Sequence, residues 1–154
     1  MGGTDDLVIR PLARSDWADW KRLWTAYLHF YGTDVGDDVK TTYFDRLLGD
    51  DPRDYAGLVA TLGDTPVGLT HYLFHRHGWK LADTCYLQDL YADEAARGKG
   101  VGRALIEAVY DAADAAGVDG VYWLTQDFNA TARQLYDRIG EVTPFIKYQR
   151  KPLA

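Results

Sequence analysis

The chain has 154 residues, 47% of them hydrophobic, which is enough to bury the core of one domain and too little for two ordinary ones. Its 17 Lys and Arg against 23 Asp and Glu give a net charge of −6, which disfavours nucleic acid as a partner and weakly favours cationic ligands such as amines. The single cysteine, Cys85, excludes an intramolecular disulfide and a cysteine-based zinc site, and no apolar run approaches the roughly 20 residues that span a bilayer.

The first part of the chain predicts a strand and an aromatic helix. Leu7–Pro11 predicts a short strand, and the residues before it lack the basic and apolar regions of a signal peptide, which favours a cytoplasmic location. Ser15 has the side chain of an N-cap. Behind it, large apolar residues recur at the spacing of one helix face: Trp17, Trp20, Trp24, Tyr27, Leu28 and Tyr31.

The middle of the chain predicts a second helix and three long strands. Two of these strands are separated by the turn Gly63-Asp64-Thr65, which is typical of a β-hairpin. The third strand leads directly into a Gly-rich segment. The predicted elements are a helix near 41–48 and strands at 56–62, 66–74 and Thr84–Ala92.

The last third of the chain predicts two helices and two strands. An amphipathic helix starts at Val101 and ends before Gly117, and a second helix is capped by Asn129 and ends before Gly140. Strands are expected at 120–125 and 142–149. The order β-α-α-β-β-β-α-β-α-β predicts a single α/β (α+β) domain over 1–154, in which helices cover a mixed sheet.

The segment Arg97-Gly98-Lys99-Gly100-Val101-Gly102 lies between a strand and a helix and has the chemistry of an anion-binding loop. Glycines permit positive φ angles, so that successive N–H groups can point into one concavity, and the helix N-terminus adds its positive dipole. The spacing fits neither a Walker loop nor a dinucleotide fingerprint. The segment therefore predicts a site for a phosphate or pyrophosphate, the alternative being a plain Gly-rich connection.

Two segments together resemble the GNAT superfamily of N-acetyltransferases. The pattern Arg97-x-x-Gly100-x-Gly102 after the strand at 86–92 is similar to the central motif of that superfamily, and 124–140 is similar to its second cofactor motif. The Tyr-Leu-x-Asp-Leu-Tyr strand resembles the branch with diamine and yeast histone-type acetyltransferases. The resemblance covers nearly the whole chain and implies a mostly antiparallel sheet with helices on both faces.

The resemblance also implies where acetyl-CoA binds as the acyl donor. It places the pantetheine arm beside the end of the third long strand, the pyrophosphate on the Gly-rich loop, and further contacts on the helix after Asn129. The implied cofactor-binding residues are Leu90, Tyr91, Ala92, Arg97, Gly98, Lys99, Gly100, Val101, Gly102, Arg103, Asn129 and Arg133. No metal is implied.

The implied chemistry is direct transfer of the acetyl group from the thioester to an amine. Tyr136 matches the tyrosine acid of the family, and its ring also fits the apolar stripe of its helix. Diamine acetyltransferases carry Leu-Glu-Asp where this chain has Leu87-Gln88-Asp89, and glutamine cannot take a proton. Either Asp89 takes the proton, or water and backbone carbonyls do, or another acid does; Asp89 is equally well interpreted as structural.

The resemblance places the acceptor pocket against the first two helices. Its expected wall is Trp24, Tyr27, Tyr31 and Gln88, with the acidic Asp34, Asp37 and Asp38 nearby, although the alternative for these residues is a core face followed by a solvated loop. Cys85 is interpreted as a buried core residue. His29, His71, His75 and His77 are expected at the surface or facing substrate, not on zinc.

The sequence thus predicts an N-acetyltransferase for the primary amine of a small molecule such as a diamine or an amino acid. The alternatives are a protein lysine or N-terminal acetyltransferase, and a non-catalytic acyl-CoA sensor. Relatives in the resembled branch commonly form dimers, so a homodimer or higher homo-oligomer is expected, with no nucleic acid or membrane as partner.

Overall fold

The computed structural model describes residues 6–153 and divides the chain into two units, 1–124 and 125–154, each of which is described by itself. The expected absence of a signal peptide rests mainly on residues 1–5, which lie outside the described part. The prediction of one domain over the whole chain stays a prediction. No helix in the range 6–153 is long and apolar enough to cross a membrane.

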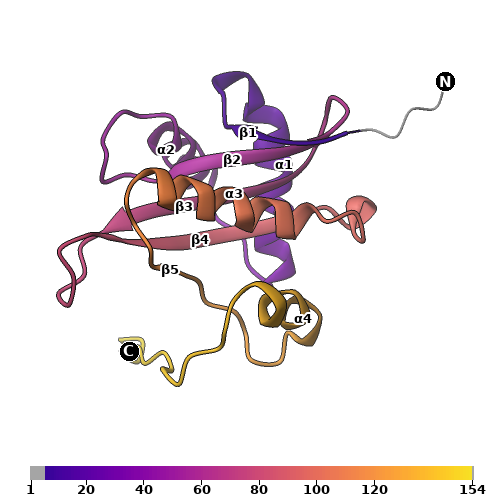
Figure 1. Ribbon diagram of the computed structural model, residues 1–154. Coiled ribbons are helices and arrows are strands. Elements are labelled where there is room, and N and C mark those ends of the chain that lie inside the picture. The colour runs from indigo at the N-terminus through magenta and orange to yellow at the C-terminus, as the bar shows by residue number, and fades with distance from the viewer. Residues whose placement is uncertain (1–5, 154) are drawn as a thin grey trace. The chain divides into compact units, whose positions relative to one another are not determined.

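The first unit is built on a five-stranded sheet whose strands lie in chain order (Figure 1). The first three pairings are antiparallel and the last, between β4 and β5, is parallel. This confirms the predicted mixed, mostly antiparallel sheet. The strands are β1 (Leu7–Pro11), β2 (Ala56–Leu62), β3 (Thr65–His75), β4 (Thr84–Ala92) and β5 (Val121–Tyr122).

Helices cover both faces of this sheet, as predicted (Figure 1). On one face, α1 (Trp17–Phe30) and α2 (Asp37–Leu47) enclose an aromatic core around Trp20, which is fully buried. On the other face, α3 (Val101–Ala115) buries the apolar stripe that contains Leu105. The predicted periodicities of α1 and α3 are therefore confirmed, because the residues at those spacings form the two cores.

Gly68 on β3 determines how closely α3 approaches the sheet. A Cβ at this position would lie 2.8 Å from Val101 Cγ1 and 2.9 Å from the carbonyl oxygen of Tyr91, closer than real Cβ contacts. Only glycine therefore allows the N-terminal turn of α3 to rest on β3 and β4. This contact fixes the Gly-rich loop before α3 relative to the end of β4.

A β-bulge in β4 determines which side chains face α1 and α2. His71 of β3 pairs with Asp89, whereas the next residue, Tyr72, pairs with Leu87, so Gln88 is the extra residue on β4. In a regular strand, consecutive side chains point to opposite faces. The bulge breaks this alternation and lets Gln88 and Asp89 line one pocket.

Three predicted boundaries in the first unit are wrong. Helix α1 begins at Trp17 after a 3₁₀ turn, η1 (Arg14–Asp16). Asp16, not Ser15, holds this 3₁₀ turn, because its carboxylate accepts from the backbone N–H of Ala13 and binds Arg10. Helix α2 begins four residues before the predicted 41, with Asp37 and Asp38 in its first turn, where carboxylates suit the helix dipole. Strand β5 is much shorter than 120–125.

The second unit consists of α4 (Ala130–Ile139) and the segments on either side of it. Asn129 caps this helix as predicted: its Oδ1 accepts from the backbone N–H of Ala132 at 3.3 Å. The strand predicted at 142–149 is absent from the described residues, so the predicted element order is wrong at its end. Pro144 has no N–H to donate to a ladder, and the alternation of side chains that follows it does not by itself supply a partner strand.

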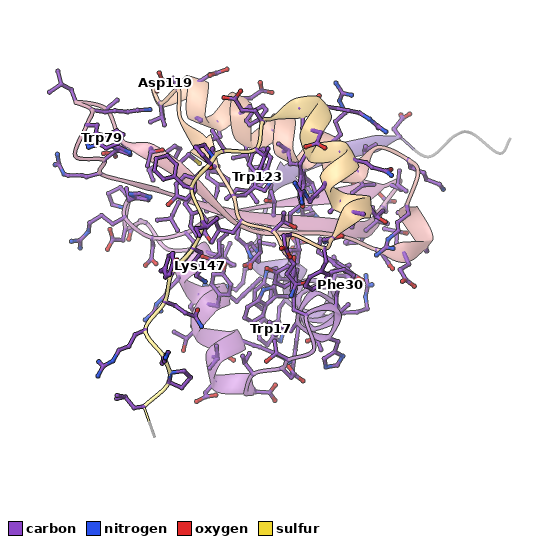
Figure 2. The ribbon with its side chains drawn as sticks, turned by 90° about the horizontal axis from the view of Figure 1, so that it is seen from below. Trp17, Phe30, Trp79, Asp119, Trp123 and Lys147 are labelled. Atoms are coloured by element: carbon purple, nitrogen blue, oxygen red, sulfur yellow. The ribbon has the colours of Figure 1, made fainter. Side chains whose placement is uncertain are left out.

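The loop between β3 and β4 is the most exposed apolar part of the first unit. Its Trp79 is 85% exposed, and Figure 2 shows it far from Trp17, which packs with the buried aromatic residues of α1 and α2. The tryptophans therefore belong to different environments, and among the described residues only Trp24 of α1 lines the pocket described next.

Candidate active site

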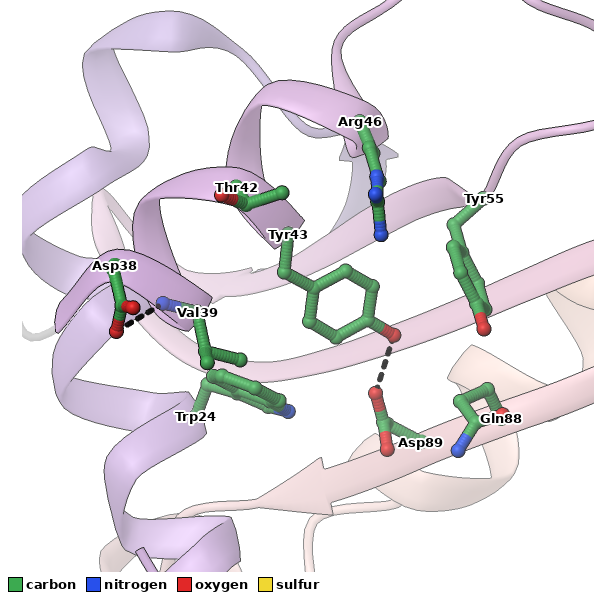
Figure 3. A pocket seen from close by; sticks show the side chains of 9 residues that line it. All are labelled: Trp24, Asp38, Val39, Thr42, Tyr43, Arg46, Tyr55, Gln88 and Asp89. Atoms are coloured by element: carbon green, nitrogen blue, oxygen red, sulfur yellow. Dashed lines mark hydrogen bonds between the residues drawn. The ribbon is translucent and has the colours of Figure 1, made fainter. Parts of the chain in front are cut away.

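A pocket of about 370 Å³ opens where α1, α2 and the bulge of β4 meet (Figure 3). Its volume is in the range of small-molecule sites, and its lining combines aromatic rings with charged groups. The residues that line it are Trp24, Asp38, Val39, Thr42, Tyr43, Arg46, Tyr55, Gln88 and Asp89.

Asp89 lies at the bottom of this pocket and is only 4% exposed. Its Oδ2 accepts the Tyr43 hydroxyl proton at 2.6 Å and the Nδ1 proton of His71 at 2.8 Å. Tyr27 lies near this carboxylate and contributes to lowering its pKa. The carboxylate is therefore buried from water, but hydrogen-bond donors of the protein stabilise its negative charge.

The tautomer of His71 follows from its second hydrogen bond. The indole N–H of Trp20 lies 2.9 Å from His71 Nε2, and both groups are buried. An indole nitrogen can only donate, so Nε2 must accept and the ring proton must reside on Nδ1. His71 is therefore neutral and donates to Asp89, and Trp20, on α1, closes the chain of hydrogen bonds on the side away from the pocket.

These contacts determine the ionisation of the pocket. Burial by itself would raise the pKa of Asp89, but the hydrogen bonds from His71 and Tyr43, with a smaller contribution from Tyr27, outweigh it and hold the pKa below its ordinary value. Burial and the neighbouring Asp89 carboxylate raise the pKa values of Tyr27 and Tyr43. At neutral pH the pocket thus holds an ionised Asp89 surrounded by neutral phenols.

The structure brings the four predicted acceptor-side residues near Asp89 in different ways. Trp24 and Gln88 line the pocket, Tyr27 contributes to lowering the pKa of Asp89, and Tyr31 packs edge-on against Tyr27 with ring centroids 5.1 Å apart. Their role in binding an acceptor stays a prediction.

The three acidic residues expected beside them are separated in the structure. Asp34 forms ion pairs with the buried Lys40 at 3.1 Å and with His29 at 3.2 Å. Asp37 pairs with Lys21 at 3.3 Å, and only Asp38 lines the pocket. Most of the acidic loop is thus used to hold α1 and α2 together.

The Gly-rich loop has the backbone conformation that an anion site requires. Gly98 and Gly100 have φ angles of 79° and 78°, and a Cβ at either position would meet no atom within 4 Å. Gly100 is the N-cap residue of α3, and among the described residues no side chain caps this helix end. The first N–H groups of α3 therefore have no intrahelical partner and face the loop. Free N–H groups at a helix N-terminus are the donors that phosphate oxygens bind.

The basic side chains near this loop differ in their contacts. Arg97 lies 4.0 Å from Glu94, and Arg103 is held by Glu107 at 2.7 Å along α3. Both guanidinium groups are more than half exposed, so these ion pairs are weak and can exchange for a phosphate. Lys99 lies between the two positive-φ glycines, and Val101 and Gly102 belong to the first turn of α3.

Strands β4 and β5 separate beside this loop. Among the described residues they pair only at Cys85 with Val121 and at Tyr86 with Tyr122, although β4 continues to Ala92. The edge of β4 at the predicted cofactor-binding residues Leu90, Tyr91 and Ala92 is therefore unpaired with β5, and its backbone groups can bind an extended ligand.

The predicted residues of the second unit share one face of α4. Asn129, Arg133 and Tyr136 are spaced by four and three residues, which places them in one stripe. Arg133 also donates to the carbonyl oxygen of Asp127 at 2.7 Å and so steadies the loop before the helix. A common site for these residues and Asp89 stays a prediction.

Cys85 is confirmed as a core residue and the prediction for His71 is wrong. Cys85 is fully buried, and burial raises the pKa of its thiol to about 11, which opposes a nucleophilic role. His71 is also fully buried, because it fills the space between Trp20 and Asp89. Within residues 6–153 there is no cluster of three or more metal-ligating side chains.

Two functional candidates, Tyr43 and Arg46, were missed from the sequence. Both lie on α2, three residues apart, and therefore point to similar sides of the helix. The only sequence signal was that spacing, and it cannot show that the helix faces a buried carboxylate.

Comparisons with known proteins agree with this fold. The sequence profile of a family described as "Acetyltransferase (GNAT) family" matches residues 17–140. The chain is 36% identical over 148 residues to a D-amino-acid N-acetyltransferase of Saccharomyces cerevisiae, covering 95% of this chain and 91% of the relative.

Solved structures show the same architecture. An aminoglycoside N-acetyltransferase in complex with CoA superposes with a TM-score of 0.85 at 17% identity, covering 99% of both chains. A ribosomal-protein-alanine N-acetyltransferase of Brucella melitensis biovar Abortus superposes with a TM-score of 0.74 at 20% identity, covering 95% of this chain and 99% of the other. At these identities the likeness shows the fold alone.

Proposed function

The chain belongs to the acetyltransferase (GNAT) family and is an N-acetyltransferase, and we propose that it moves an acetyl group from acetyl-CoA directly to the primary amine of a small molecule. The observation that carries the acceptor side is the pocket of about 370 Å³ that ends on the ionised Asp89. An anion at the bottom of an aromatic pocket attracts an ammonium group. The name of the yeast relative, a D-amino-acid N-acetyltransferase, supports the same class, because an amino acid is a small molecule with a primary amine.

The Gly-rich loop fits the acyl donor. Gly98 and Gly100 leave open space beside the uncapped start of α3, which suits the pyrophosphate of acetyl-CoA, and the unpaired edge of β4 suits its pantetheine arm. Both features lie on the first unit, at the end of β4 that follows its bulge and in the segment after it. We assign Leu90, Tyr91 and Ala92 to the pantetheine, and residues 97–103 to the phosphates.

In the reaction the amine nitrogen attacks the thioester carbonyl carbon, the carbon–sulfur bond breaks, and the thiolate of CoA takes a proton. The lowered pKa of Asp89 makes it a weak base, so we assign it the role of a fixed anion that positions Tyr43 and the acceptor. Before the attack the acceptor ammonium must lose a proton, because only the neutral amine has a lone pair, and we assign this step to water at the pocket mouth. Tyr136 is assigned as the proton donor, because a phenol with an ordinary pKa of about 10 stays protonated at neutral pH.

The test is the release of CoA thiol from acetyl-CoA across a panel of amines, with the acetylated product identified by its mass. We expect release with small primary amines, and at least a roughly tenfold loss of turnover in Tyr136→Phe with little change in acetyl-CoA affinity. Tyr148→Phe is the matched control, because it removes a phenol hydroxyl outside α4. Tight acetyl-CoA binding without release for any small amine would overturn the proposal, and unchanged turnover in Tyr136→Phe would remove its assigned role.

A further inference from the structure

The charged groups of the pocket define its acceptor more narrowly than a primary amine. Resting on the function proposed above, we infer that the acceptor is a zwitterionic amino acid and that Arg46 binds its carboxylate. The inference depends on two hydrogen-bond donors in the pocket, Arg46 and Trp24, and on the anion Asp89, which lines the same pocket.

Arg46 extends from the last turn of α2 into the space between Tyr43 and Tyr55 (Figure 3). Among the described residues no carboxylate lies within ion-pair distance of its guanidinium. The adjacent Asp45 is taken by Arg14, whose Nη1 lies 2.6 Å from its carboxylate. A guanidinium that faces a pocket without a protein partner is suited to bidentate binding of a ligand carboxylate.

Trp24 is the second donor without an acceptor. The side chain is 6% exposed, and within the described part of the chain its buried indole nitrogen has no hydrogen-bond partner. Figure 3 shows that nitrogen turned toward the part of the pocket where Asp89 lies. A buried N–H is costly when unsatisfied, so a ligand with an acceptor atom at this place gains affinity.

These donors discriminate between two classes of amine. A protonated diamine has only donors, so it can satisfy neither Arg46 nor the Trp24 indole, and its second charge would be repelled by Arg46. An amino acid offers two carboxylate oxygens as acceptors and one ammonium group for the side of the pocket where Asp89 lies. The pocket has one other charged residue besides Arg46 and Asp89, which is Asp38. Asp38 lies eight residues before Arg46 on α2, which places the two residues about 12 Å apart along the helix axis.

The test compares both enantiomers of leucine with isoamylamine, which is leucine without its carboxylate, and with putrescine as a diamine. For the wild type we expect kcat/KM for leucine of at least one enantiomer to exceed that for isoamylamine and putrescine by about tenfold or more. In Arg46→Gln the ratio of leucine to isoamylamine should fall at least about tenfold, through KM, while acetyl-CoA affinity is kept. In Arg46→Lys the ratio of leucine to isoamylamine should fall less than in Arg46→Gln, because the positive charge remains. It should still fall, because lysine cannot bind a carboxylate in the bidentate geometry.

Two further variants separate specific binding from general damage. Arg53→Gln removes a guanidinium outside the pocket, 88% exposed and paired with Asp51, and should leave the ratio unchanged. Trp24→Phe removes the indole N–H and should raise KM for leucine by about threefold to tenfold more than for isoamylamine.

The outcomes distinguish this inference from the proposed function. Acetylation of isoamylamine or putrescine as efficiently as leucine would overturn the inference and leave the N-acetyltransferase of small amines intact. The same holds if Arg46→Gln lowers kcat/KM for all acceptors equally. If none of these amines is acetylated although acetyl-CoA binds, the proposed function itself fails.

Discussion

The pocket at Asp89 and the Gly-rich loop lie on the same unit but are built in opposite ways. The pocket is made of side chains that hold one another: Trp20 donates to His71, His71 to Asp89, and Tyr43 to Asp89. The loop is made of backbone, and its two positive-φ glycines have open space around them. One site depends on side-chain identity and the other on chain conformation.

This difference follows from the ligands that the two regions are proposed to bind. A pyrophosphate is the same in every acyl-CoA, so N–H groups at a helix start suffice and no side chain needs to discriminate. An acceptor must be distinguished from other amines, and that requires side chains fixed in position by their neighbours. Substitutions in the pocket should therefore affect folding and acceptor use together, whereas those in the loop should affect acetyl-CoA affinity.

The largest effect is expected from Asp89→Asn. A neutral amide oxygen is a weaker acceptor than a carboxylate, so the two charge-assisted hydrogen bonds from His71 and Tyr43 weaken, and we expect a loss of about 2–4 kcal/mol in the free energy of unfolding at neutral pH. Chemical denaturation measures this loss, and kcat for any acceptor should fall with it.

The pH dependence of the same variant gives a control. Because the pKa of Asp89 is lowered in the folded protein, its stabilising contribution is complete above the unfolded pKa of about 3.9 and is lost as pH falls through the lower folded value. The difference in stability between wild type and Asp89→Asn should therefore shrink below about pH 4. A difference that is constant down to pH 2 would show that the carboxylate is not held as described.

A smaller effect is expected from Gly100→Ala, and α3 offers a matched control at its other end. Gly100 and Gly117 have φ angles of 78° and 73° with open space at Cβ, so an alanine at either costs about 1–2 kcal/mol of backbone strain. Only Gly100→Ala should also weaken acetyl-CoA binding, by about tenfold, because it distorts the N–H groups at the helix start. Equal loss of acetyl-CoA affinity in both variants, measured by calorimetry, would refute the assignment of the loop.

The smallest effect is expected at Cys85. Its thiol is fully buried with a raised pKa of about 11, so alkylation of the native protein at pH 7 should be slow and the activity should persist. Rapid inactivation that tracks modification of this thiol would instead support a covalent acyl-enzyme. Thiol labelling followed by mass spectrometry decides between these results.

The sequence predicted the region built from backbone better than the region built from side chains. Gly98, Gly100 and Asn129 have conformational roles that local residue types reveal, and each is confirmed. Trp20 and His71 are 51 positions apart, and Tyr43 and Asp89 are 46 apart, so no local pattern could pair them. His71 looked like a surface histidine because only the fold shows that it faces α1.

Two other differences have physical causes that lie outside local patterns. The bulge at Gln88 shifts the alternation of β4 and places two consecutive side chains in one pocket, which periodicity cannot predict. The segment at 142–149 has the alternating side chains of a strand, but a strand also needs a neighbouring strand that accepts and donates its backbone hydrogen bonds. The local pattern predicts the alternation and cannot predict whether that neighbour is present.

Backbone hydrogen exchange with each ligand alone tests most directly whether the two regions serve two substrates. Acetyl-CoA should slow exchange of the amides of residues 98–103, which have no helical acceptor, and leave α2 nearly unchanged. Leucine should slow exchange around residues 42–46 of α2 and at the bulge of β4, and leave the loop unchanged. Protection of the Gly-rich loop by leucine, or of the pocket alone by acetyl-CoA, would contradict the division proposed for this enzyme.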